Sequence, residues 1–113
     1  MILGRVVGQV WATRRDPRLS RARLLVIRLH AVYEPAFASG HLVAVDDVDA
    51  GVGDDVIVCL GAPARASAGG DDMPVDAAVL GVVDRVTLTA APAMAAEGAA
   101  PGIRRPLNVE VGG

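Results

Sequence analysis

The sequence has almost no aromatic residues and no lysine. Trp11, Tyr33 and Phe37 are its only aromatic side chains, so a hydrophobic core must be built from valine, leucine, isoleucine and alanine. Valine-rich segments favour β-strands. All 11 basic residues are arginines and 13 residues are acidic, which gives a net charge of −2. A charge this small gives no bias towards nucleic acid or towards an anionic membrane.

The chain also lacks a second cysteine and a long apolar run. Cys59 stands alone, which excludes an internal disulfide and is typical of a reducing compartment. No apolar run reaches the roughly 18 residues that a membrane-spanning helix needs, and no basic segment precedes a hydrophobic one near the start. We therefore expect no membrane span, no signal peptide and a cytoplasmic location.

What is present is a short and apolar chain. Its 113 residues suffice for one domain. Hydrophobic residues make up 52% of the sequence. Because a domain of this size buries only about two-thirds of its unfolded surface, much of this apolar content must sit in a small core or meet a partner. Association with other molecules would bury the apolar surface that the core cannot hold.

Five short segments have the composition of β-strands, and they are residues 2–13, 24–29, 42–45, 56–60 and 77–88. Gly4 and Gly8 fall on the small apolar face of the first strand, which is typical of a tightly curved sheet. The remaining segments, including residues 62–74 with Pro63, are predicted to be loops. This pattern predicts an all-β fold: a small five-stranded β-barrel resembling the oligonucleotide/oligosaccharide-binding (OB) type, with long loops. A β-sandwich is the alternative.

The chain divides into two regions. Residues 1–88 hold all five predicted strands and form the β-barrel domain, whereas residues 89–113 are rich in alanine, proline and glycine and predict a flexible C-terminal tail. Apolar and polar residues alternate over residues 107–111. This alternation predicts a short strand that could pair with an open strand edge of its own chain or of a neighbour.

Charge is unevenly spread along the sequence. Residues 1–30 hold seven arginines and one acidic residue, whereas residues 46–55 hold five aspartates, so we expect a basic and an acidic pole. The aspartates do not fit a calcium-binding loop, because Val52 occupies the glycine position and Val58 the position of the bidentate glutamate. Nor does the Gly-Val-Gly segment at residues 51–53 continue into a dinucleotide fingerprint, since the third glycine is missing.

Few residues are suited to catalysis. His30 and His41 are the only histidines, and neither lies at close metal-ligand spacing from Cys59. We predict two loop histidines, a small buried Cys59, no cofactor, no metal and no enzymatic activity. A small acid/base enzyme built on His41 and Asp46 is the weakest alternative.

The clustered arginines suggest a different alternative function. Arg14, Arg15, Arg18, Arg21 and Arg23 could bind single-stranded nucleic acid on a barrel of this type. Such barrels usually stack bases on aromatic side chains, and this chain has only three aromatic residues. We therefore favour solvated or interfacial arginines and expect no nucleic-acid partner.

Three blocks of sequence carry a resemblance to a known family. The first is Leu-Gly-Arg-Val-Val-Gly-Gln-Val-Trp-Ala-Thr-Arg-Arg at residues 3–15. The others run from Val-Ala-Val-Asp to Ala-Gly-Val-Gly-Asp (residues 43–54) and from Val-Asp-Ala-Ala to Gly-Val-Val-Asp (residues 75–84). In this order and spacing they resemble the EutN/CcmL family of pentameric vertex proteins from carboxysomes and other bacterial microcompartments, and residues 61–65 resemble the family's Gly-x-x-Ala-Arg turn. Arg21 departs from the family, which commonly has glycine there.

The resemblance implies a structural, non-catalytic protomer. Five copies would form a ring that caps the corner of a shell in the cytoplasm, and hexameric or pseudohexameric proteins would form the flat facets. A cyclic ring joins two different patches of neighbouring copies, so arginines of one copy would pair with aspartates of the next.

We expect two sets of residues to serve this assembly. The candidates for the subunit interface are Trp11, Arg14, Arg15, Arg65, Asp46 and Asp84. Trp11 could instead belong to the core, because an isolated tryptophan on a strand contributes a large apolar area. The candidates for the fivefold axis or pore are Ala50, Gly51, Val52 and Gly53, which could equally form an ordinary tight turn.

Overall fold

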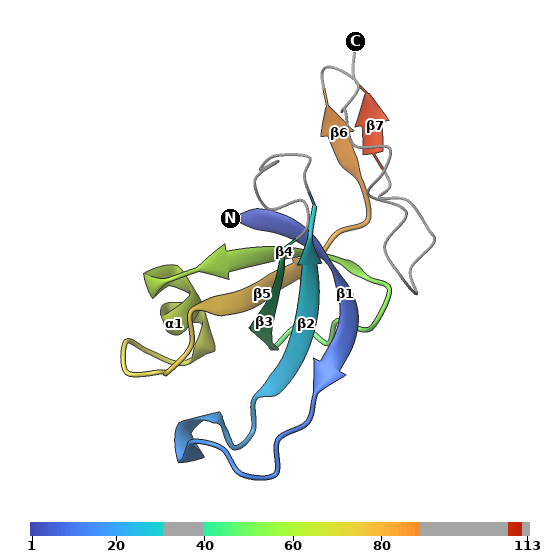
Figure 1. The fold of residues 1–113 in the computed structure, drawn as a ribbon. Coiled ribbons are helices and arrows are strands. Elements are labelled where there is room, and N and C mark those ends of the chain that lie inside the picture. The colour runs from blue at the N-terminus through green and yellow to red at the C-terminus, as the bar shows by residue number, and fades with distance from the viewer. Residues whose placement is uncertain (31–39, 89–108, 112–113) are drawn as a thin grey trace.

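The computed structural model describes residues 1–30, 40–88 and 109–111, and its centre is a closed five-stranded β-barrel (Figure 1). The barrel strands are β1 (Ile2–Val10), β2 (Arg23–Leu29), β3 (His41–Asp46), β4 (Asp55–Leu60) and β5 (Ala77–Val82). Their order around the barrel is β1-β2-β3-β5-β4, and every neighbouring pair is antiparallel except β3 and β5. The predicted all-β barrel is confirmed.

The glycines of β1 allow a close approach to β2. A Cβ atom on Gly4 would overlap the Cγ2 atom of Ile27 and lie 3.0 Å from the Arg28 carbonyl oxygen. The register between β1 and β2 shifts between Val6 and Gly8, as at a β-bulge. Gly4 and the bulge thus let β1 curve tightly around the core.

Alternation places one face of each strand inside the barrel. The fully buried interior side chains include Val6, Leu25, Ile27, Val56 and Val58. A second, smaller cluster of Val45, Cys59, Ala64 and Ala78 lies outside the barrel wall, under helix α1 (Ala62–Ala68). The buried, apolar environment predicted for Cys59 is confirmed.

The prediction of a loop over residues 62–74 is wrong for its first half. Helix α1 occupies Ala62–Ala68, with Pro63 in its first turn, where a missing N–H costs nothing, and with Gly69 at its end in a positive-φ conformation. Two turns of helix are too short to produce a recognisable hydrophobic period. Ala64 anchors the helix because its side chain is fully buried against the barrel.

The segment 77–88 forms two strands rather than one. Strand β5 ends at Val82, and β6 (Val86–Leu88) leaves the barrel and pairs in parallel with β7 (Val109–Val111) (Figure 1). The first strand is also shorter than the predicted residues 2–13, since β1 ends at Val10. Residues 89–108 of the predicted tail lie outside the described residues. No helix among the described residues is long and apolar enough to cross a membrane.

Candidate functional site

The loop of residues 11–22 between β1 and β2, which we call the arm, extends from one end of the barrel (Figure 1). Arg15 holds the arm together from within. Its Nε donates to the carbonyl oxygen of Ala12 at 3.2 Å, and its Nη1 donates to those of Leu19 and Ala22 at 3.0 and 2.7 Å. These three hydrogen bonds from one guanidinium to backbone carbonyls fix the shape of the arm within a single protomer.

A second arginine ties the arm to the loop after α1. Arg18 forms a two-point ion pair with Asp16 and donates from Nη1 to the Asp72 carbonyl oxygen at 2.8 Å. Asp16 also accepts from the Arg18 backbone at the start of the 3-10 helix η1 (Pro17–Leu19). The hydrogen bonds from Arg18 lower the pKa of Asp16 from 3.8 to about 2.

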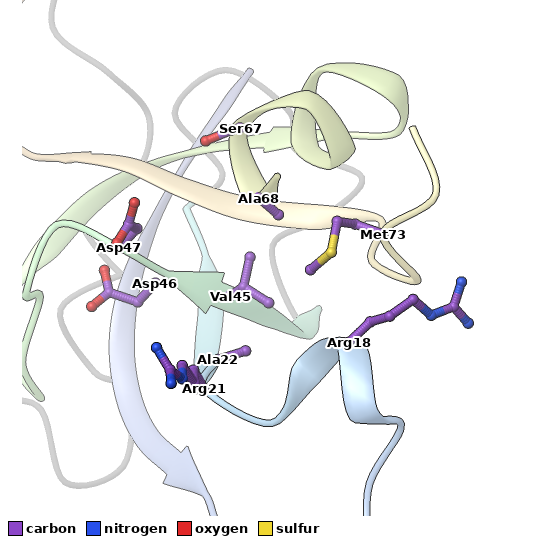
Figure 2. A pocket seen from close by; sticks show the side chains of 9 residues that line it. All are labelled: Arg18, Arg21, Ala22, Val45, Asp46, Asp47, Ser67, Ala68 and Met73. Atoms are coloured by element: carbon purple, nitrogen blue, oxygen red, sulfur yellow. The ribbon is translucent and has the colours of Figure 1, made fainter. Parts of the chain in front are cut away.

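A hollow of about 210 Å³ opens between the arm, the end of β3 and α1 (Figure 2). Figure 2 shows Arg21, Asp46 and Asp47 on one side of it and Met73 on another. Residues from the basic and the acidic stretch therefore line the same hollow. The expectation of two separate charged poles is wrong, because folding brings the two stretches together.

The acidic stretch mainly builds its own turn. Asp46 accepts from the backbone of Ala50 at 3.1 Å and of Val48 at 3.3 Å, and it forms an ion pair with Arg23 at 3.1 Å. Arg23 also donates to the Ala50 carbonyl oxygen at 2.6 Å. Asp49 turns the chain with a φ of 61°. Among the described residues, no group of three histidine, cysteine or acidic side chains could hold a metal ion.

In the turn at residues 50–53, the first residue is buried and the tip around Val52 is exposed. Ala50 is fully buried in the barrel core, and Gly51 donates its N–H to the Asp54 carboxylate at 2.8 Å. Val52 is 59% exposed, and Gly53 has a φ of 96°, which glycine adopts most readily. Only the tip is therefore available to a neighbour.

A buried charge cluster, formed by Arg5, Asp55 and His30, lies where β1 and β4 pair. Arg5 Nε donates to Asp55 Oδ1 at 2.7 Å, and His30 Nε2 lies 3.2 Å from the same oxygen. Their exposed fractions are 1%, 3% and 5%. Burial raises the pKa of the Asp55 carboxyl, but the hydrogen bonds from His30 and Arg5 outweigh it, so that the pKa lies below its usual 3.8.

Sequence reasoning missed this cluster. His30 was predicted to be an ordinary loop histidine, and no role was predicted for Arg5 or for Asp55 as its partner. Arg5 and Asp55 are 50 residues apart, so no local pattern pairs them, although Arg5 interrupts an apolar run and Asp55 directly precedes one. His41 begins β3 and is exposed, whereas Asp46 ends the same strand, so the two do not face each other.

The six expected interface residues lie at four places. Trp11, Arg14 and Arg15 belong to the arm, and Trp11 is 83% exposed, which excludes it from the core of the protomer. Arg65 lies on α1. The other two are Asp46, at the end of β3, and the exposed Asp84, between β5 and β6.

The arginine cluster is largely committed to the protein itself. Arg15, Arg18 and Arg23 hold the arm and the acidic turn. Arg14 and Arg21 make no hydrogen bond to any other residue that the structure describes. Of the five clustered arginines, only these two are left to contact phosphates, and Trp11 is the one exposed aromatic side chain beside them in the described part of the chain. This surface is small for binding a single-stranded nucleic acid.

Several apolar side chains besides Trp11 are exposed. Val43 on β3 and Leu80 and Val82 on β5 are between 41% and 46% exposed. The strands β3 and β5 pair only at Val45 with Ala78 and at Asp46 with Val79, so Val43 lies before this pairing and Leu80 and Val82 lie after it; we call these three side chains the apolar flank. An apolar flank on an otherwise closed barrel is typical of an association surface.

Comparison with known proteins identifies the relatives of this barrel. Residues 1–84 match the family described as "Ethanolamine utilisation protein EutN/carboxysome". The microcompartment shell vertex protein GrpN of Rhodospirillum rubrum is 44% identical over 87 residues, which cover 76% of this chain and 96% of GrpN. The shell vertex protein PduN of Salmonella typhimurium is 42% identical over 90 residues, which cover 77% and 99% of the two chains.

Solved structures agree with this relationship. CcmL of Gloeobacter violaceus superposes with a TM-score of 0.70 at 33% identity, over 81% of this chain and 94% of CcmL. The pentameric shell protein GrpN superposes with a TM-score of 0.62 at 38% identity, over 74% and 95% of the two chains. Sequence and fold both match over the whole barrel, and the chain therefore belongs to the EutN/CcmL family of shell vertex proteins.

Proposed function

We propose that this chain is a structural subunit that forms pentamers and caps the vertices of a bacterial microcompartment shell. The match of the whole barrel to GrpN, a pentameric shell protein, carries this proposal. The chain has no catalytic role in it. Hexameric or pseudohexameric shell proteins are its partners along the facets, and the shell lies in the cytoplasm. A flat sheet of hexamers closes only when pentamers introduce curvature at the corners.

The exposed apolar side chains supply most of the association energy. Trp11 on the arm and the flank of Val43, Leu80 and Val82 lie on different parts of the barrel, as the two patches of a heterologous ring interface must. Burial is worth roughly 25 cal/mol per Å² of apolar area before the costs of association. A rigid arm lowers those costs, because Arg15 has already ordered it.

The charged candidates act in two ways. Arg14, Arg65 and Asp84 form pairs at the rim, and exposed pairs contribute only about 0–1 kcal/mol each. Such pairs set the register of neighbours more than the strength of binding. Arg15 and Asp46 act indirectly, since their side chains already shape the arm and the acidic turn.

The tip of the turn at residues 50–53 lies at the fivefold axis. Val52 is exposed there, and the flanking Gly51 and Gly53 have no side chains to collide when five copies converge. Ala50 anchors the turn in the core of its own protomer. This arrangement would place a ring of five valines around a narrow opening.

The mass of the purified protein tests the ring. Native mass spectrometry should find about 58 kDa, five times the 11.6 kDa of one chain. Co-expression with hexameric shell proteins should then give closed shells in electron micrographs, and omission of this chain should leave them open at the corners. A stable monomer at micromolar concentration would overturn the proposal.

A further inference from the structure

We propose that neighbouring subunits exchange their terminal strands, so that the β7 bound to β6 in the assembled ring comes from the adjacent copy. The inference rests on the proposed pentamer and deepens it, because it names a contact between copies. Its ligand is an extended segment of a second copy of this chain, Val109–Val111, and its binding site is the edge of β6, Val86–Leu88.

The β6–β7 pair is a small sheet that stands apart from the barrel (Figure 1). Three residue pairs form it, Val86 with Val109, Thr87 with Glu110 and Leu88 with Val111, and the strands are parallel. Two short strands alone are at best marginally stable in water. The pairing needs a further source of stability, and an assembled ring would provide one.

Only one strand of the pair is fixed to the barrel. Val86 of β6 is buried, and it lines an apolar groove of about 340 Å³ with Ile2, Leu3, Ile57 and Val83. The Val83 N–H also bonds to the Asp55 carbonyl oxygen at 2.7 Å. Among the described residues, neither β6 nor β7 makes extensive contact with any strand except the other. They differ in attachment, because β6 follows β5 after three residues and its Val86 is buried beside the barrel, whereas the pairing with β6 is what holds β7.

The connection is long enough to reach a neighbour. Twenty residues, 89–108, separate the two strands in sequence. A parallel pair within one chain requires a connection of only about a dozen residues. A random-coil linker of twenty residues would have a root-mean-square end-to-end distance of about 25 Å. A domain the size of the barrel is roughly 30 Å across, so a linker of this length would reach an adjacent barrel.

Exchange loses no contact and connects the ring. The same three residue pairs form whether β7 comes from its own chain or from the next one, and five donors meet five acceptors in a closed cycle. A linker whose length matches the span between two sites gives the highest effective concentration, in the millimolar range. Each bound strand then helps to hold its donor in the ring.

A disulfide trap reports which chain supplies the strand. The variant Thr87→Cys/Glu110→Cys, in a Cys59→Ala background, places two thiols on register partners. Paired strands lie about 4.8 Å apart, within the Cα separation that a disulfide allows. After mild oxidation, a non-reducing denaturing gel should show covalent multimers up to five chains. A single-chain product with an internal disulfide would overturn the exchange.

Two chains that each carry one thiol provide the matched control. Thr87→Cys and Glu110→Cys chains, co-expressed in the same Cys59→Ala background, can form a bond between register partners only across subunits. We expect a covalent dimer from the mixture and none from either variant alone. Native mass spectrometry without oxidation separates the two proposals: five chains without the dimer overturn strand exchange alone, whereas a monomer overturns the proposed pentamer as well.

Discussion

The buried charge cluster and the exposed apolar flank reverse the usual distribution of residues. Arg5, Asp55 and His30 are almost fully buried, whereas Trp11 and Val43 face solvent. Charged side chains are rarely buried unless they are paired, and large apolar ones usually gather inside. The contrast agrees with the proposed ring, in which charge holds the protomer together and the exposed apolar surface meets neighbouring copies.

The buried cluster joins three parts of the barrel that are distant in sequence. Arg5 lies on β1, Asp55 begins β4, and His30 follows β2. Burial of an ion pair adds little net stability, because desolvation offsets the attraction, but the loss of one partner leaves a charge without compensation. The cluster thus penalises any arrangement of the barrel in which these three parts do not meet.

Removal of the Asp55 carboxylate should give the largest effect. Asp55→Ala leaves Arg5 buried without its carboxylate and should lower the free energy of unfolding by about 3–5 kcal/mol. Urea denaturation at one fixed protein concentration measures this loss. The exposed Asp47→Ala is the matched control and should change stability by less than about 0.5 kcal/mol. Equal effects of the two substitutions would contradict the contrast between buried and exposed charge.

Truncation of Trp11 should affect assembly and leave the protomer folded. Trp11→Ala should weaken subunit association by about 2 kcal/mol or more per interface, because buried tryptophans dominate most protein interfaces. Dilution followed by light scattering measures this as dissociation at higher protein concentration. Arg14→Ala, on the same arm, should cost about 1 kcal/mol or less. A ring that withstands dilution equally with and without Trp11 would remove this residue from the interface.

The strands were predictable from the sequence because each of them is a local pattern. All five barrel segments were found, and the curvature at Gly4 followed from glycines on the small apolar face of β1. The ends of strands were less accurate, since β1 ends at Val10 and β5 at Val82. Helix α1 was missed because two alanine-rich turns resemble a loop in composition.

The charged contacts were not predictable, because they depend on distant pairing. The sequence separates arginines from aspartates, but the fold joins Arg23 to Asp46 and Arg5 to Asp55. The function was accessible only through the resemblance carried by three blocks. Composition alone left open nucleic-acid binding, and it gave no sign that the Arg15 side chain bonds to backbone carbonyls within the arm.

Two glycines of β1 should differ in how well they tolerate a methyl group. Gly4→Ala would push a Cβ into Ile27 and the Arg28 carbonyl, next to the buried charge cluster, and should cost about 1–3 kcal/mol. Gly8→Ala places its Cβ 3.8 Å from Val26, an ordinary contact, and should be nearly neutral. Thermal unfolding of both variants measures the difference. Similar midpoints would show that β1 can shift to accommodate Gly4→Ala.

Acid should separate the buried carboxylate from an exposed one. The pKa of Asp55 is lowered on folding, so its contribution to stability is full above the usual value of 3.8 and is lost as the pH falls below it. The pKa of Asp16 is lowered to about 2, so its contribution is lost between about pH 4 and 2. Urea denaturation from pH 6 to pH 2.5 should show both losses.

Salt distinguishes the two carboxylates. Asp16 is exposed to solvent, so 0.5 M salt should largely screen its pairing with Arg18, whereas the buried pair of Asp55 and Arg5 is screened much less. Asp55→Asn should therefore flatten the pH dependence of stability at both low and high salt, and Asp16→Asn should flatten it only at low salt. If Asp55→Asn keeps the wild-type acid profile at high salt, the loss of stability in acid does not originate in the buried cluster.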